Sequence, residues 1–348
     1  MFDVQHLLET VYPKIQPPII IVGGSPRVAA ECALVVADFP TVCFQMDVHQ
    51  AERLERELAE VGLSTEVRVT ADIWDLPNHF QTAIVPIQSH GERELKLDLM
   101  EQTYHVLQPK GLCITVSEYT KDSLLPKVHK KLYGKCSEAP ANKKGSIFWS
   151  VRTDDRPRRR HEMTFRARIG DIPSREFVSR PGVFCYGSFD DGARALLECA
   201  DIRPNETILD LGCGVGAVGI LAAERTGLDA PITFVDSNAR AIALTELNAK
   251  ANGLTNYTTI LSARMADLEE GHFDVILANP PYYAASSIAE LFVRKSKALL
   301  KSGGRFYLVT KQVNTLAPLV MEAFGDAIVM ETRGYHVIQG DRIMESER

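Results

Sequence analysis

Short segments made almost entirely of apolar residues recur along this chain, separated by longer segments with helical periodicity. In the second half, the apolar segments cover residues 207–211, 232–236, 258–261, 273–278 and 305–310. A strand that is apolar at nearly every position is typical of a parallel sheet with helices on both faces. The pattern therefore predicts an α/β fold in which strands and helices alternate.

The first half of the chain repeats this succession of elements at an offset of about 190 residues, which is the size of a domain. Its apolar segments cover residues 19–22, 42–46, 80–85 and 112–117. The long helix of each half is followed by glycine and leucine, at Gly62-Leu63 and at Gly253-Leu254, and Asp72 resembles Asp267. We therefore predict two tandem copies of one domain.

The two predicted copies differ in the segments that carry chemistry. Where the second copy has Asp210-Leu211-Gly212-Cys213-Gly214-Val215-Gly216, the first has Val22-Gly23-Gly24-Ser25-Pro26. Where the second copy has Asn279-Pro280-Pro281-Tyr282, the first has Val85-Pro86-Ile87-Gln88. We expect a degenerate N-terminal domain over residues 1–150, a basic linker over residues 151–180 and a working domain over residues 181–348.

Bulk composition agrees with a globular protein of two domains. A chain of 348 residues exceeds what one hydrophobic core usually serves, and 45% of its residues are hydrophobic. No apolar run approaches the roughly 20 residues that a bilayer requires, so no membrane segment is expected. The seven cysteines form no Cys-x-x-Cys pair and the histidines have no metal-ligand spacing, which predicts no metal site and a reducing cytoplasm.

The formal net charge of −6 does not indicate a nucleic-acid binder, but arginines gather in one stretch. They are Arg152, Arg156, Arg158, Arg159, Arg160, Arg166 and Arg168. Such a cluster can neutralise phosphates while the rest of the protein stays acidic. A solvated linker between domains is the alternative interpretation.

Three glycines, Gly212, Gly214 and Gly216, follow a predicted strand and open a helix. Glycine accepts positive φ and lets the backbone approach a ligand closely, although dinucleotide-binding loops have a similar pattern. Asp210 ends the strand, where its carboxylate can orient the loop and face an amino group. A pyrophosphate would gain nothing from that negative charge.

Two further acids follow neighbouring strands at the same edge of the sheet. Asp236 can accept hydrogen bonds from two ribose hydroxyls, and Asp267 with the Ala266 backbone can receive an adenine amino group. Helix capping and turn formation are the structural alternatives for these acids. The predicted cofactor-binding set is Asp210, Gly212, Cys213, Gly214, Gly216, Asp236, Ser237, Ala266, Asp267 and Asn279.

The segment Asn279-Pro280-Pro281-Tyr282 follows the fourth strand directly, and its prolines impose a rigid turn. The side-chain oxygen of Asn279 and the carbonyl of Pro280 can both accept hydrogen bonds from one NH2 group. These two hydrogen bonds localise the lone pair of a conjugated amine on its nitrogen and stabilise the positive charge that develops there. Tyr282 offers a flat face for stacking. We predict that these four residues are catalytic in transfer to a planar amine, with a structural Pro-Pro turn as the alternative.

These motifs resemble those of class I S-adenosylmethionine (AdoMet)-dependent methyltransferases, with residues 210–216 as motif I and residues 279–282 as motif IV. The whole chain resembles the bacterial rRNA guanine-N2 methyltransferases of the RsmC/RlmG type, which pair a degenerate N-terminal domain with an active C-terminal one. The lead-in Pro181-Gly182-Val183-Phe184, followed by Phe189-Asp190-Asp191-Gly192 and Leu196-Leu197, is similar to that family's. Before about residue 180 the resemblance is one of architecture alone.

The resemblance implies two tandem Rossmann-like class I methyltransferase domains with mostly parallel seven-stranded sheets. It implies AdoMet as cofactor and methylation of a guanine N2 amine in ribosomal RNA or a ribosomal subunit, the small subunit being favoured. Gly187 and Asp190 are expected to border the cofactor. Cys185 stands where the family has serine, and Tyr283 where it has histidine. The predicted substrate-binding set is Phe184, Tyr282, Tyr283, Arg158, Arg159 and Arg160.

Three alternatives to this function stay open. The Asn-Pro-Pro-Tyr motif equally suits adenine N6 or a protein glutamine, since each offers an NH2 group with a delocalised lone pair. A protein of another class, an inactive RNA-binding or assembly factor, would keep the fold as a relic. We also expect a monomer, because two fused copies can replace a homodimer.

Overall fold

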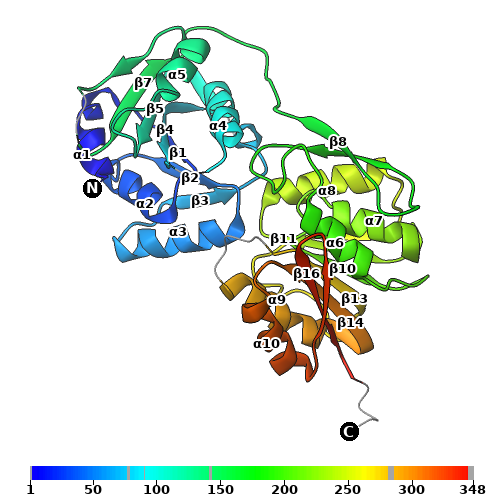
Figure 1. Ribbon diagram of the computed structural model, residues 1–348. Helices are drawn as coiled ribbons and strands as arrows, with labels where there is room; N and C mark the ends of the chain where they lie inside the picture. Colours follow the sequence, from blue (N-terminus) through cyan, green and yellow to red (C-terminus); the bar gives the residue numbers. More distant parts are fainter. Residues whose placement is uncertain (1, 77–78, 90, 141–142, 281–285, 344–348) are drawn as a thin grey trace. The chain divides into compact units, whose positions relative to one another are not determined.

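The computed structural model describes residues 2–76, 79–89, 91–140, 143–280 and 286–343. The chain divides into two compact units, Met1–His161 and Glu162–Arg348 (Figure 1). Each unit contains one seven-stranded sheet, and a separate pair of strands lies in the second unit. The predicted fold class, two tandem Rossmann-like domains with mostly parallel sheets, is confirmed.

The first unit orders its strands β3-β2-β1-β4-β5-β7-β6, in which β1 to β5 pair in parallel and β7 pairs antiparallel with both β5 and β6. The strands are β1 (Ile19–Val22), β2 (Thr41–Gln45), β3 (Glu66–Val69), β4 (Phe80–Ile87), β5 (Leu107–Ser117), β6 (Ser137–Glu138) and β7 (Ser146–Val151). The helices are α1 (Val4–Glu9), η1 (Tyr12–Lys14), α2 (Pro26–Val35), α3 (Val48–Glu60), η2 (Ile73–Asp75), α4 (Arg93–Val106) and α5 (Leu125–Tyr133).

The second unit repeats this topology in the order β12-β11-β10-β13-β14-β16-β15. Its strands are β10 (Ile208–Leu211), β11 (Ile232–Asp236), β12 (Tyr257–Leu261), β13 (Phe273–Ala278), β14 (Leu300–Thr310), β15 (Ile328–Thr332) and β16 (Tyr335–Asp341). Its helices are α6 (Asp191–Cys199), α7 (Ala217–Thr226), α8 (Ala239–Ala251), α9 (Ser286–Leu299) and α10 (Val313–Phe324). Of the described helices, none combines the length and the apolar composition that crossing a bilayer requires.

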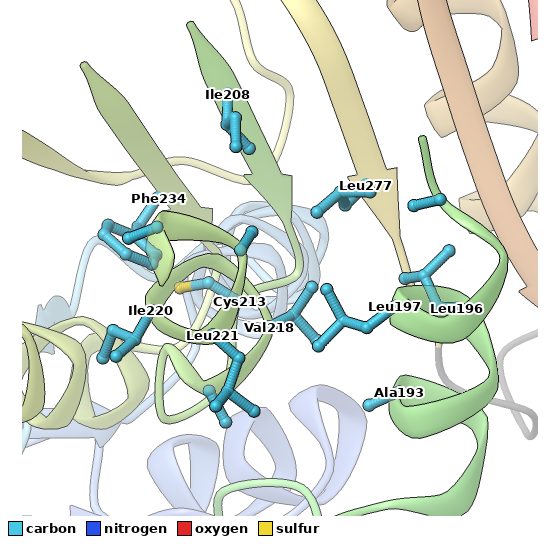
Figure 2. Packing of buried hydrophobic residues seen from close by; sticks show 14 of the residues in the cluster. Ala193, Leu196, Leu197, Ile208, Cys213, Val218, Ile220, Leu221, Phe234 and Leu277 are labelled. Atoms are coloured by element: carbon cyan, nitrogen blue, oxygen red, sulfur yellow. The ribbon is translucent and has the colours of Figure 1, made fainter. Parts of the chain in front are cut away.

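Both faces of the second sheet are buried, which explains why its strands are apolar at successive positions. Ile208 packs in the cluster on one face and Leu209 in the cluster on the other, as alternation along a strand requires. On the first face, Leu197 of α6 and Val218 of α7 lie side by side beneath the strands (Figure 2). Helices on both faces therefore fix the carboxyl ends of β10, β11 and β13 relative to one another.

The pairing of strands within each sheet gives a residue-by-residue correspondence between the sequences of the two units. Ile19 pairs with Thr82, and Ile208 pairs with Val275, so the register sets Pro86 at the position of Asn279. The sequence comparison had set Val85 there, one residue away. A Cβ added to Gly24 would lie 2.6 Å from Cγ of Pro86, so proline fills this edge of the first sheet.

The acid that ends the second strand is also replaced in the first unit. Ile19 pairs with Thr41 and Ile208 with Ile232, which aligns Gln45 with Asp236. The Gln45 side-chain amide is buried and donates to the carbonyl oxygen of Gly24 at 3.4 Å. The first unit therefore keeps the sheet and has lost the acid that ends the second strand.

Part of the stretch expected as a basic linker is folded. The strands β8 (Met163–Ala167) and β9 (Arg175–Ser179) form an antiparallel pair in the second unit. Phe165 faces Phe177 across the pair, with ring centroids 5.4 Å apart, and the buried Phe177 joins the core of the unit. Arg166 forms an ion pair with Glu176 across the same strands.

Candidate active site

A loop with three left-handed glycines connects β10 to α7. Gly212, Gly214 and Gly216 have φ values of 70°, 58° and 80°, which a residue with a Cβ rarely adopts. The backbone N–H of Gly212 and that of the next residue donate to the carbonyl oxygen of Val235, at 2.8 and 3.0 Å. The loop is thereby attached to the end of β11, and α7 begins directly after it.

Asp210 is buried beneath this loop. Its Oδ2 accepts a hydrogen bond from the backbone N–H of Gly219 in the first turn of α7, at 2.8 Å. Burial raises the pKa of the carboxyl to about 7, against the lowering effect of the Gly219 hydrogen bond, and the nearby Asp236 adds to the rise. Asp210 thus orients the loop through a helix-capping contact, in a place that favours either a proton or a cation.

Asp236 connects the glycine loop to the start of α8. Its Oδ2 accepts from the N–H of Gly214 and its Oδ1 from the N–H of Asn238, both at 2.9 Å. Each carboxylate oxygen has more than one lone pair, so an oxygen that accepts one of these bonds can accept another. Ser237, the next residue in the predicted set, is partly buried.

The loop after β12 begins beside this acid. The N–H of Ser262 donates to the carbonyl oxygen of Asp236 at 2.9 Å, and the Ser262 hydroxyl accepts from the N–H of Met265 at 3.0 Å. Met265 is buried with a φ of 54°. Ala266 and Asp267, which follow it, are exposed at the surface.

Asn279 comes directly after β13, next to β10 in the sheet. Its side-chain Nδ2 donates to Oδ2 of Asp190 at 2.9 Å, across 89 positions of sequence. Pro280 is buried. The predicted residues Pro281, Tyr282 and Tyr283 lie outside the described residues.

The lead-in loop before α6 supplies the partner of Asn279. Asp190 caps α6, since its Oδ2 also accepts from the N–H of Ala193 at 2.8 Å. Gly187 has a φ of 76°, and its N–H donates to the hydroxyl of Ser179 at 2.7 Å. Phe184 on the same loop is 42% exposed.

Sequence reasoning missed Asn248, which is fully buried on α8. Its Oδ1 accepts from the N–H of Val178 at 2.8 Å, and its Nδ2 donates to the carbonyl oxygens of Val178 and Val215, each at 2.9 Å. One amide therefore holds β9 against the glycine loop. The available signal was an asparagine on the face of α8 that also carries Ala241 and Leu244, where an unpaired amide would be costly.

The sheet edge brings most of the predicted cofactor set together, whereas the predicted arginines belong to the first unit. Arg158 and Arg160 lie over the ring of Trp74, 5.6 and 5.9 Å from its centroid. Arg158, Arg159 and Arg160 are all exposed. In the described parts of the chain, no cluster of three or more His, Cys, Asp or Glu side chains is suited to hold a metal ion.

Comparison with known proteins defines the class. Residues 174–339 match the family model described as Methyltransferase small domain. This match and the order of the strands place the second unit among the Rossmann-like methyltransferase domains. The first unit has the same strand order without that match.

Individual relatives show which methyltransferases the chain is similar to. Over 204 residues, the chain is 31% identical to "Ribosomal RNA small subunit methyltransferase C" of Pseudomonas entomophila (strain L48), covering 56% of this chain and 60% of that protein. It is 29% identical over 214 residues to "Uncharacterized protein YbxB" of Bacillus subtilis (strain 168), covering 60% of this chain and 97% of that one. The chain thus spans about three fifths of the length of the first of these relatives.

The fold of the whole chain is also found in a solved structure. The T. thermophilus 16S rRNA N2 G1207 methyltransferase (RsmC), in complex with AdoMet and guanosine, superposes with a TM-score of 0.78. Its sequence is 20% identical, and the superposition covers 97% of this chain and 91% of that one. The resemblance to guanine-N2 methyltransferases of the RsmC type, inferred above from motifs, is confirmed.

Proposed function

We propose that this protein is an AdoMet-dependent methyltransferase that modifies the exocyclic N2 amine of a guanine in small-subunit ribosomal RNA. The observation that carries the proposal is the position of Asn279, held at the carboxyl end of β13 beside the glycine loop of β10. An amide acceptor at this edge suits a planar NH2 group. The names of the relatives favour ribosomal RNA over the other substrates that the motif allows.

The residues at the sheet edge fit AdoMet. A Cβ at Gly214 would have Val183 as its nearest neighbour, at 3.9 Å, so the backbone here is open to a ligand. Asp236 would accept the ribose hydroxyls, and the backbone and side chain at Ala266 and Asp267 would meet the adenine. The buried Asp210 would be stabilised in its charged form by the ammonium group of the methionine moiety. When bound, AdoMet supplies an electrophilic methyl group.

The chain's own contribution to the reaction is to hold the target amine. The Asn279 amide oxygen and the Pro280 carbonyl accept its two hydrogens, which localises the nitrogen lone pair and stabilises the cation that forms. Tyr282 stacks on the base, Phe184 frames it, and Tyr283 takes the place of the family histidine. Holding the amine in one orientation provides much of the rate enhancement, because methyl transfer needs close alignment.

The exposed arginines of the first unit are proposed to bind RNA phosphates. Among the described residues, Arg158 and Arg159 form no ion pair, whereas Arg152 and Arg156 pair with Asp155 and Asp154. A guanidinium stacked on an aromatic ring keeps its N–H edge available for a phosphate. This difference favours a structural role for Arg152 and Arg156 and an RNA-binding role for Arg158 and Arg159.

The remaining alternatives differ in the product that they form. An N6-adenine methyltransferase would leave N6-methyladenosine, a glutamine methyltransferase would leave RNA unmodified, and an inactive assembly factor would not transfer methyl groups. We further propose a monomer that acts in the cytoplasm, where ribosomal subunits are present. Replacement of the Asn279 and Asp236 positions by Pro86 and Gln45 favours a supporting role for the first unit.

Nucleoside analysis of ribosomal RNA tests this function. Small-subunit RNA from a deletion strain, digested to nucleosides, should lose N2-methylguanosine, and the wild-type gene should restore it while Asn279→Ala should not. Loss of N6-methyladenosine instead would favour the adenine alternative. An unchanged nucleoside profile, with no methyl transfer by the purified protein to subunits or naked RNA, would overturn the assignment.

A further inference from the structure

The side chain of Asp190 connects three segments of the second unit. Its Oδ2 accepts from the N–H of Ala193 at 2.8 Å and from Nδ2 of Asn279 at 2.9 Å. Its Oδ1 accepts from the Cys185 thiol at 3.7 Å. The carboxylate therefore joins the start of α6 and the lead-in loop to the residue that follows β13.

The lead-in loop is itself held in a constrained conformation. Cys185 has a φ of 56° and Gly187 a φ of 76°, so two residues within three positions are left-handed. The N–H of Gly187 is bound by the Ser179 hydroxyl at 2.7 Å, and the capping contact to Ala193 fixes the other side. Because both sides are anchored, Asp190 has a defined position from which to act on Asn279.

An asparagine amide has an oxygen end that accepts and a nitrogen end that donates, and the two ends have nearly the same shape. Rotation by 180° exchanges them at little steric cost. An asparagine that must accept hydrogen bonds from an amine therefore needs a neighbour that rejects the rotated form. An ionised carboxylate is such a neighbour, because it accepts and does not donate.

We propose that Asp190 is a positioning residue that locks the Asn279 amide with its nitrogen toward the carboxylate and its oxygen toward the substrate amine. The rotated amide would set its oxygen against the Asp190 carboxylate. The negative charge of Asp190 also polarises the amide, which makes its oxygen a better acceptor as positive charge grows on the target nitrogen. This role differs from the direct cofactor contact that the family resemblance implies for Asp190, and it rests on the proposed function.

The two roles predict opposite kinetic effects in Asp190→Asn, which keeps the size of the side chain and a good helix-capping group. A positioning role predicts that kcat falls about 10-fold, the change expected when the acceptor of the Asn279 hydrogen bond loses its charge, while the Kd of AdoMet changes less than about threefold. A cofactor-contact role predicts a weaker AdoMet Kd and a normal kcat at saturation. The matched control is Asp191→Asn, which removes the same charge from a neighbouring side chain that is 71% exposed.

A double-mutant cycle separates positioning from general destabilisation. If Asp190 acts through the Asn279 amide, Asp190→Asn should lower kcat in the wild-type background and have no further effect in Asn279→Ala. Asp190→Ser, which keeps a capping hydroxyl and is too short to reach Asn279, should lower kcat with the fold intact by circular dichroism. Equal effects of Asp190→Asn in both backgrounds would overturn the proposal.

A measurement independent of turnover keeps this test distinct from that of the proposed function. In protein labelled with ¹⁵N-asparagine, the side-chain amide signals of Asn279 are assigned by their loss in Asn279→Ala. The hydrogen that is bound to Asp190 should resonate downfield in the wild type and move upfield in Asp190→Asn, with no such change in Asp191→Asn. An unmoved amide signal would refute the positioning role, even if the wild-type protein methylates ribosomal RNA. A shifted signal in a protein that methylates another amine would uphold it and refute only the substrate.

Discussion

The carboxylate of Asp210 accepts a hydrogen bond from the backbone N–H of Gly219 at 2.8 Å, and both groups are buried. One neutral donor does not compensate for the loss of water around an ionised acid. Burial accordingly raises the pKa of Asp210 to about 7 from its ordinary value of 3.8, and the charge of Asp236 adds to the rise. Ionised Asp210 therefore destabilises the folded protein when no cofactor cation is bound.

This raised pKa predicts how stability varies with pH. Between pH 3.8 and about 7 the unfolded chain loses the proton of Asp210 while the folded protein keeps it. The associated stabilisation is complete below pH 3.8 and is lost as pH rises through about 7, an effect on the order of 4 kcal/mol. In the absence of cofactor, Asp210→Asn should flatten this part of the pH profile of the free energy of unfolding.

Urea unfolding followed by circular dichroism at several pH values would check the prediction. Tryptophan fluorescence would not, because Trp74 and Trp149 both belong to the first unit and report on that unit alone. The exposed Asp229→Asn in the second unit supplies the control for charge. Parallel pH profiles for wild type and Asp210→Asn would contradict a titrating Asp210.

Two left-handed glycines with nearly equal φ give a matched test of packing at the loop. Gly216 has a φ of 80°, and a Cβ there would lie 3.0 Å from Cγ2 of Thr245. Gly253 has a φ of 81° with no atom within 4 Å of such a Cβ. We expect Gly253→Ala to cost about 1 kcal/mol from backbone strain, and Gly216→Ala to cost about 1–3 kcal/mol more from crowding.

Hydrogen exchange, read on peptides from the second unit, would compare the two variants. Gly216→Ala should also weaken AdoMet binding, since it shifts the loop, whereas Gly253→Ala should leave binding unchanged. Equal losses of stability in the two variants would mean that the loop relaxes around the added methyl group.

The parallel sheets were predictable from sequence because burial on both faces demands apolar residues at nearly every position, as in β10 and β13. The β8 and β9 pair was not predicted, since each strand is only five residues long and Phe165 meets Phe177 only through the turn between them. The glycine loop was also predictable, because its three glycines lie close together in the sequence and directly follow a strand. The bond from Asn279 to Asp190 was not, because a contact across 89 positions leaves no periodicity in the chain.

The Asn279 side chain should matter for turnover and little for cofactor binding. Asn279→Ala removes one of two acceptors for the target amine, so kcat should fall about 100-fold or more, by analogy with the loss of one donor from an oxyanion hole. Calorimetric titration with AdoMet should give a Kd within a few-fold of the wild type. Turnover by Asn279→Ala at the wild-type rate would show that the amine is activated by other groups.

The exposed arginines of the first unit predict how RNA binding depends on salt. Each phosphate contact releases about one counterion, so the slope of log K against log salt measures the number of contacts. Arg158→Ala with Arg159→Ala should weaken binding of small-subunit RNA and make the slope shallower by about two, without altering the AdoMet Kd. Arg53→Ala with Arg56→Ala is the matched control, because both side chains are exposed on α3 of the same unit. Fluorescence anisotropy at several salt concentrations provides the comparison. If the two double variants reduce the slope equally, RNA responds to the net charge of the unit, and residues 158–160 form no particular binding surface.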